Sequence, residues 1–307
     1  MREARRKYPQ TISRYGLPVA KLKAQNMNEL VQSSKTCRQC IFVLLQIFAV
    51  LFALQPLTGS AETNAPRRAL VVGVANYDGS SKLKNPLNDA SDIASALETT
   101  GSFKVTLVTD AGRKELRAAI DAFSASAKDS EVVLFYFSGH GLSTSCDVFM
   151  IAQDDEPRRL SEDLSGLVSL RYILGRLAFK RADYQQDRKA HSTIVILDSN
   201  LDNPFSSPRT RSLGAAQSCP RGDSLLPAVP ETFIAFATQF GEVAFDNAAP
   251  GDRNSPFTKH LLRAMQQPNL SIEEVFKEVR RGVVKGTKGR QVPWERTSLT
   301  GFFAFRR

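Results

Sequence analysis

Two short polar segments in this chain follow apolar runs that are typical of buried strands. Ser138-Gly139-His140-Gly141 comes at the end of the run 131–138, and Asp198-Ser199-Asn200 closes the run 192–199. Functional sites in open α/β sheets gather where parallel strands end, so we expect both segments at one edge of the sheet. The glycines that flank His140 permit the tight backbone of a turn at a strand end. The sequence therefore predicts a polar site that contains His140.

The other two histidines do not indicate a metal site. His191 precedes an apolar run, and His260 stands beside Lys259 in a predicted helix, so we expect both side chains to be solvated. Three histidines scattered over the chain lack the close spacing of metal ligands. We therefore predict no metal site and no cofactor.

Strand and helix patterns alternate around the two polar segments. Short apolar runs predict strands at 69–75, 104–109, 131–138, 192–199, 232–238 and 299–305. Helical periodicity and capping residues predict helices at 85–99, at 113–127, at 172–179, after Ser255-Pro256 and after the capping box of Ser271 and Glu274. This order predicts an α/β fold with a mostly parallel sheet and right-handed crossovers.

The chain of 307 residues has a formal net charge of +10 that is unevenly distributed. Residues 1–61 hold nine Lys and Arg against two acidic residues, which is a net charge of +7 and leaves +3 for residues 62–307. The latter part has no run of basic residues interleaved with aromatics that would follow a phosphate backbone. We therefore do not expect nucleic acid as a partner.

An apolar run at 41–54 follows Lys35 and Arg38 and precedes Pro56 and several small residues. Its 14 residues are fewer than the ~20 that a membrane-spanning helix needs, which favours a signal peptide with cleavage after Ala61. The basic stretch before it is long for a leader, so translation is expected to start at Met27. A signal peptide predicts an exported protein, which is either periplasmic or secreted. The alternative is an uncleaved anchor at 41–57, through which alone the protein would contact a membrane.

Ordered segments from Arg68 to Phe305 resemble bacterial members of the caspase/metacaspase family of cysteine peptidases. The similar segments are RALVVGVANY, LKNPLNDASDIASAL, VTLVTD, LFYFSGHG, ILDSNLDNPF, FIAFAT, NSPFTKHLL, QVPWE and SLTGFF. The resemblance implies a three-layer sandwich in which helices flank a six-stranded, mostly parallel sheet. It also implies a caspase-like domain at 62–307, with a large-subunit-like part at 67–202, a loop at 203–231 and a small-subunit-like part at 232–307.

The resemblance implies that His140 is the general base and that Gly141 belongs to the oxyanion site. Family members read Asp-x-Cys-Arg-Asp-Asn-Pro, whereas this chain has Asn200 in place of the cysteine and Leu201 in place of the arginine. A thiol becomes a strong nucleophile when histidine takes its proton, but an amide proton is not removable at ordinary pH. Loss of the nucleophile costs a comparable protease roughly a millionfold in turnover. We therefore expect peptidase activity near background.

Three other side chains are alternative nucleophiles. Ser199 neighbours Asn200, but the alternation of a strand predicts that it faces away from His140. Cys146 and Cys219 are thiols that would have to move toward the histidine, and they are alternatively inert or paired with each other. The predicted functions therefore remain an inactive peptide-binding protein and, as the alternative, an active cysteine endopeptidase.

By resemblance to metacaspases, Asp89 and Asp198, with Ser138 beside them, form an acidic pocket for Arg or Lys of a peptide or protein. Paired carboxylates suit a guanidinium or ammonium partner. The alternative for Asp89 is a carboxylate that stabilises the start of a helix. Many metacaspases use calcium, but no clear ligand set is present, and Asp154-Asp155-Glu156 is interpreted as a solvated loop. In the loop at 203–231, cleavage by another protease is expected after Arg209, Arg211 or Arg221.

Overall fold

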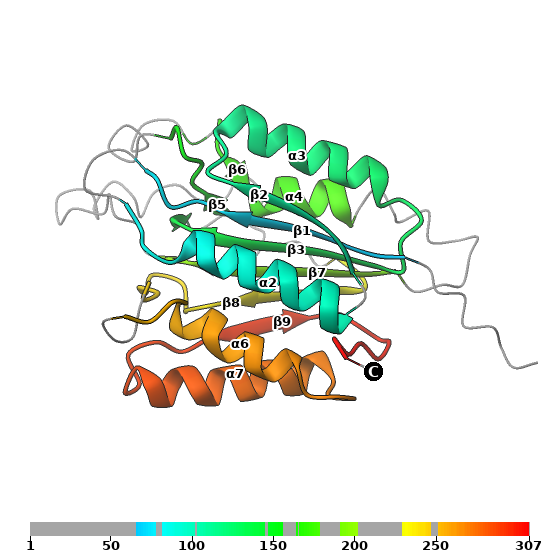
Figure 1. Ribbon diagram of the computed structural model, residues 1–307. Helices are drawn as coiled ribbons and strands as arrows, with labels where there is room; N and C mark the ends of the chain where they lie inside the picture. Colours follow the sequence, from blue (N-terminus) through cyan, green and yellow to red (C-terminus); the bar gives the residue numbers. More distant parts are fainter. Residues whose placement is uncertain are drawn as a thin grey trace, which may run out of the picture. The chain divides into compact units, whose positions relative to one another are not determined.

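A six-stranded sheet forms the centre of the fold (Figure 1). Its strands lie in the order β2-β1-β3-β7-β8-β9. The first five strands in this order are parallel, and β9 is antiparallel to β8. The bounds are β1 Arg67–Gly73, β2 Phe103–Thr109, β3 Val132–Gly139, β7 Ser192–Ser199, β8 Thr232–Phe236 and β9 Trp294–Thr297. The predicted α/β class and mostly parallel sheet are confirmed.

The computed structural model describes about three quarters of the residues from 66 to 306. The described ranges are 66–77, 82–101, 103–144, 147–155, 164, 166–178, 191–201, 229–246 and 251–306. They all fall in the unit Asn64–Arg307. The predicted leader, Cys146, Cys219 and the loop arginines lie outside the described residues. Within the described ranges, no helix has the length and apolar character that crossing a membrane requires.

Helices cover both faces of the sheet and give it two separate cores. On one face lie α3 (Arg113–Ser126) and α4 (Leu170–Leu177), and on the other lie α2 (Pro86–Gly101), α6 (Pro256–Met265) and α7 (Ile272–Gly286). Alternate residues of a strand enter opposite cores, because side chains alternate along a strand. In β3, for example, Phe135 packs with α3 and Tyr136 with α6. The sequences of the central strands are continuously apolar because these strands are buried on both faces.

Helix starts agree with the predicted capping residues. The Ser255 hydroxyl accepts a hydrogen bond from the Thr258 N–H, and Pro256 occupies the first turn of α6. Ser271 and Glu274 form the predicted capping box at the start of α7. The helix α4 begins at Leu170, two residues before its predicted start, because the side chain of Ser169 caps it.

The strand predicted at 299–305 is wrong. The last strand is β9 at Trp294–Thr297, and the alternating apolar residues after it belong to a segment without strand pairing. Phe303 and Phe305 of this segment are buried in the core beside α6 and α7. Its backbone meets the turn between those helices, where Ile272 N–H donates to the Phe303 carbonyl over 2.9 Å. The apolar pattern at 299–305 thus arises from the burial of side chains and does not indicate a ladder of backbone hydrogen bonds.

A second, three-stranded sheet was not predicted. It consists of β4 (Gly141–Ser143), β5 (Val148–Met150) and β6 (Val168–Ser169), all antiparallel. Strands of two or three residues are too short to show a period in the sequence. Its first strand follows His140 directly, so this small sheet anchors the far side of the histidine turn.

Candidate active site

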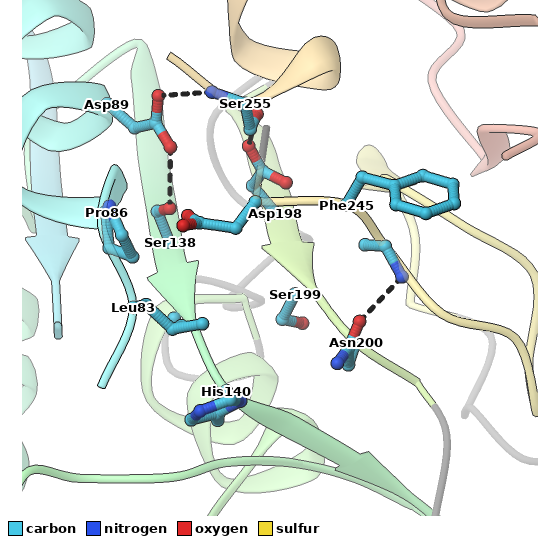
Figure 2. Close-up of a pocket in the computed structure, with 13 residues that line it drawn as sticks. Leu83, Pro86, Asp89, Ser138, His140, Asp198, Ser199, Asn200, Phe245 and Ser255 are labelled. Carbon is cyan, nitrogen blue, oxygen red and sulfur yellow. Dashed lines mark hydrogen bonds between the residues drawn. The ribbon is translucent and has the colours of Figure 1, made fainter. Parts of the chain in front are cut away.

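The parallel pairing of β3 and β7 brings the two polar segments together. Ser138 lies opposite Asp198 and Gly139 opposite Ser199 in the register of the two strands. Both segments therefore end at the same edge, and His140, Asp198, Ser199 and Asn200 line one pocket (Figure 2). The start of α2, the segment after β8 and the start of α6 complete this pocket.

His140 is half-buried and is held through its backbone. Its N–H donates to the Tyr77 hydroxyl over 2.8 Å, and that hydroxyl donates to the Ile151 carbonyl over 3.1 Å. The two rings lie 4.6 Å apart at 53°. Burial raises the pKa of Tyr77, so the phenol stays neutral and continues to donate. Sequence reasoning missed Tyr77, although it follows β1, whose end lies at the same edge of the sheet.

Asn200 is held by the segment that follows β8. Its Oδ1 accepts a hydrogen bond from the Ala244 N–H over 2.6 Å, and Figure 2 shows the amide oxygen directed at that segment. An amide oxygen that accepts a backbone N–H is engaged in a structural contact. The residue at the family's nucleophile position therefore joins two parts of the backbone.

Ser199 is packed beneath the histidine turn. A Cβ atom on Gly141 would lie 2.7 Å from the Ser199 Oγ and 2.6 Å from the Asn200 carbonyl oxygen, so this position requires glycine. The Ser199 side chain is buried, and its hydroxyl has no hydrogen-bond partner within the described part of the chain. That Ser199 faces away from His140 stays a prediction, although both residues line the same pocket. Burial is what makes its hydroxyl inaccessible. The oxyanion role of Gly141 stays a prediction.

Asp89, Ser138 and Asp198 come together as the sequence suggested. The Asp89 carboxylate accepts hydrogen bonds from the Ser138 hydroxyl over 3.1 Å and from the Ser255 N–H over 3.0 Å. The Asp198 carboxylate accepts from the hydroxyls of Ser255 over 2.5 Å and Thr258 over 2.6 Å. Both carboxylates are buried, and Ser255 connects them from the start of α6. The sequence pattern indicates Ser255 only as a helix cap, so its contacts with the two carboxylates are a finding of the structure.

A third carboxylate, that of Asp246, also lines the pocket. It accepts hydrogen bonds from the backbone N–H groups of Lys84 over 2.8 Å and Asn85 over 3.1 Å. The Asn85 amide donates in turn to the Asp246 carbonyl over 2.7 Å. Nothing in the local sequence marked Asp246, because its partners lie more than 160 positions away.

The acidic pair carries an electrostatic cost. Burial, and next the negative charge of Asp198, raise the pKa of Asp89. Burial also raises the pKa of Asp198, against the hydrogen bonds from Ser255 and Thr258 and with a further contribution from Asp246. Two neighbouring buried carboxylates do not both ionise readily. The pocket therefore favours either a bound proton or a cation beside the pair.

The remaining candidate residues have structural partners. Asp154 accepts the Arg113 N–H at the start of α3 over 2.6 Å, and buried Asp155 pairs with the Arg113 guanidinium over 2.5 Å. The interpretation of this acidic run as a solvated loop is wrong for buried Asp155, whereas Asp154 is exposed as expected. His191 is half-buried and its Nδ1 lies 2.8 Å from the Ser130 carbonyl oxygen, so it is not simply solvated. Among the described residues, no three His, Cys, Asp or Glu side chains gather to hold a metal ion.

A central parallel sheet with a histidine turn and a polar strand end at one edge defines an α/β protein of the caspase type. The caspase domain matches residues 66–304, so the chain belongs to the caspase-domain family of cysteine peptidases. Caspase-1 from Spodoptera frugiperda has the same fold, with a TM-score of 0.57, 15% identity and coverage of 79% of this chain and 91% of that chain. The six-stranded, helix-flanked architecture implied by the resemblance is thereby confirmed.

A curated human protein is also similar. Mucosa-associated lymphoid tissue lymphoma translocation protein 1 from Homo sapiens is 26% identical over 246 residues, which cover 76% of this chain. The match covers 26% of the human protein, so the chain spans about a quarter of the length of this relative.

The raised pKa of Asp89 predicts a stability that depends on pH. The folded chain holds this proton more tightly than the unfolded chain, whose carboxyl titrates at about pH 4. The Asp89 contribution to the free energy of unfolding therefore falls as pH rises above that value. Asp89→Asn removes this dependence. Relative to wild type, the variant is expected to gain about 1–3 kcal/mol between pH 5 and pH 8.

Urea denaturation across this pH range measures the effect. Asp92→Asn is the matched control, because Asp92 lies on the same helix but its pKa is lowered by hydrogen bonds from Arg253 and Asn254, against partial burial. A difference between Asp89→Asn and wild type that does not change with pH would contradict this account.

The double role of Ser255 predicts a larger effect than that of an ordinary helix cap. Ser255→Ala removes the cap of α6 and a donor to buried Asp198, with an expected loss of about 2–4 kcal/mol in the free energy of unfolding. Ser271→Ala, at the solvent-exposed cap of α7, is expected to cost about 1 kcal/mol. Equal losses in chemical denaturation would show that the bond to Asp198 contributes nothing.

Proposed function

We propose that this protein is an exported caspase-domain pseudo-peptidase that binds a basic side chain of a peptide or protein without cutting it. The observation that carries the proposal is the buried pair of Asp89 and Asp198 at the strand ends, with Asp246 beside it. Among the described residues that line the pocket there is no Lys or Arg. The cation that this cluster favours therefore comes from a ligand.

The chemistry of Asn200 supports the absence of cleavage. Its amide has no removable proton near neutral pH, and its oxygen is engaged with the Ala244 N–H. His140 lines the same pocket, so a base is present without a nucleophile at the family position. Binding without covalent chemistry is the function that this combination supports.

Arginine fits the pocket better than lysine. A guanidinium offers five donors in a planar fork, so it can reach two carboxylates at once, whereas an ammonium acts as a point charge. Asp89 and Asp198 each keep acceptor capacity beyond their bonds to Ser138, Ser255 and Thr258. The proposed ligand is therefore a peptide that presents Arg, with Lys as the weaker alternative.

Export rests on the apolar run at 41–54 and the small residues before Ala61. N-terminal sequencing of the expressed protein tests this part of the proposal. A mature chain that begins near residue 62 agrees with a cleaved leader, whereas a chain that retains 41–57 in the membrane fraction establishes the anchored alternative.

The alternative function is an active endopeptidase that cleaves after Arg or Lys with His140 and a different nucleophile. The thiols of Cys146 and Cys219 lie outside the described residues, so this alternative rests on the sequence. It is distinguished from the proposed function by hydrolysis alone.

Hydrolysis of fluorogenic Arg and Lys peptides, with and without calcium, tests the missing nucleophile. Wild type is expected to remain at background, and Asn200→Cys is expected to gain Arg-directed cleavage that His140→Ala abolishes in the same background. Asn200→Ala is the control, because it loses the bond to Ala244 without gaining a thiol. Wild-type cleavage that His140→Ala abolishes would establish the endopeptidase instead.

Binding of an arginine peptide tests the acidic pocket. Fluorescence polarisation with the Arg peptide and its citrulline analogue separates charge from shape, since citrulline has nearly the same volume without charge. Asp89→Asn is expected to weaken Arg binding about 10- to 100-fold, because a buried charge pair is broken. Asp92→Asn is expected to leave it unchanged. Equal affinity for Arg and citrulline would contradict the proposed function.

A further inference from the structure

A second hollow lies between α6 and α7 and shares no lining residue with the acidic pocket. It encloses about 240 Å³. Its polar lining comes from one face of each helix. Successive lining residues are three and then four positions apart, which places them on the same face. These side chains are His260, Arg263 and Gln267 of α6 and its C-terminal end, and Glu278, Arg281 and Lys285 of α7.

The position of His260 depends on a glycine in the facing helix. A Cβ atom on Gly282 would lie 2.2 Å from the His260 Nδ1, and one on Gly286 would lie 3.8 Å from the Nε2. The imidazole therefore rests on bare backbone of α7 and is half-buried between the helices. The histidine that was predicted to be solvated is thus half-buried in the lining of the hollow.

Among the described residues, two cations of the hollow lack a carboxylate partner that other cations of the same helices have. On the same helices, Lys259 pairs with Asp252 over 2.8 Å, and Arg280 pairs with Glu295. In the hollow, the one carboxylate is Glu278, which pairs with Arg281 over 2.8 Å. Within the described part of the chain, neither Arg263 nor Lys285 pairs with a carboxylate.

The crowding of positive charge affects the histidine. Partial burial, and then the charges of Arg263 and Lys259, lower the pKa of His260. On the α7 side, Arg281, Lys285 and Glu278 face the same hollow. An anion placed among these groups would relieve their repulsion and would favour the protonated imidazole.

We propose that the hollow between α6 and α7 binds the phosphate group of a small phosphorylated molecule. Two guanidinium groups and an ammonium exceed what a single carboxylate neutralises, whereas a phosphate brings nearly two negative charges and several acceptor oxygens. The protein's own N-terminal segment does not supply such an anion, since residues 1–61 carry a net charge of +7. This proposal is independent of the proposed function of the acidic pocket.

Histidine NMR with inorganic phosphate and pyrophosphate as probes tests the proposal. Saturable shifts of the His260 resonances are expected, with pyrophosphate binding at about 1 mM or tighter at constant ionic strength, and with a rise in the His260 pKa. The resonances of His191 and His140 serve as internal references and should not move.

Two variants test the residues assigned to the hollow. Arg281→Gln and Lys285→Gln are each expected to weaken pyrophosphate binding at least about fivefold, because each removes a charge from the lining. Lys259→Gln is the control on α6, since Lys259 is already paired with Asp252. Asp89→Asn should leave pyrophosphate binding intact, which separates this proposal from that for the acidic pocket.

Some results would overturn the proposal. It fails if the His260 shifts do not saturate, or if chloride at the same ionic strength reproduces them. It also fails if the folded Arg281→Gln and Lys285→Gln variants, checked by circular dichroism, bind pyrophosphate as wild type does.

Discussion

The register between β3 and β7 determines where every group of the acidic site lies. Ser138 stands opposite Asp198, and both reach toward the face that α2 and α6 cover. Because side chains alternate along a strand, a slip by one residue would exchange the two faces of β7 and turn Asp198 away from Ser255. The two cores resist such a slip, since it would also move the buried residues of β7 to the wrong core. The geometry of the site is thus a consequence of apolar packing.

The start of α6 helps to hold two buried carboxylates whose burial costs stability. Ser255 caps the helix, and the same residue donates to both buried carboxylates. The helix dipole adds a favourable field at this end of α6, where negative charge is stabilised. These contacts offset only part of the desolvation of Asp89 and Asp198, as the raised pKa values of both residues indicate. The acidic pair therefore lowers the stability of the protein when both carboxylates are ionised.

Local patterns allowed the central strands, the helix caps and the histidine turn to be predicted, because each follows from a period or from a neighbouring residue. The segment 299–305 was misassigned because alternating burial of Phe303 and Phe305 imitates a strand. Strand ends and family resemblance allowed part of the pocket lining to be predicted. This part includes Asp89 and Asp198. The contributions of Tyr77 and Asp246 depend on contacts between distant segments, and no period of the sequence carries that information.

The bond between Asn200 and Ala244 has a consequence for a chain that is cut. Asn200 belongs to the part before the loop at 203–231, and Ala244 belongs to the part after it. The parallel ladder of β7 and β8, from Thr193 opposite Thr232 to Leu197 opposite Phe236, joins the same two parts. Cleavage within the loop would therefore yield two fragments that stay associated as a heterodimer. The Asn200 side chain is among the contacts that hold them together.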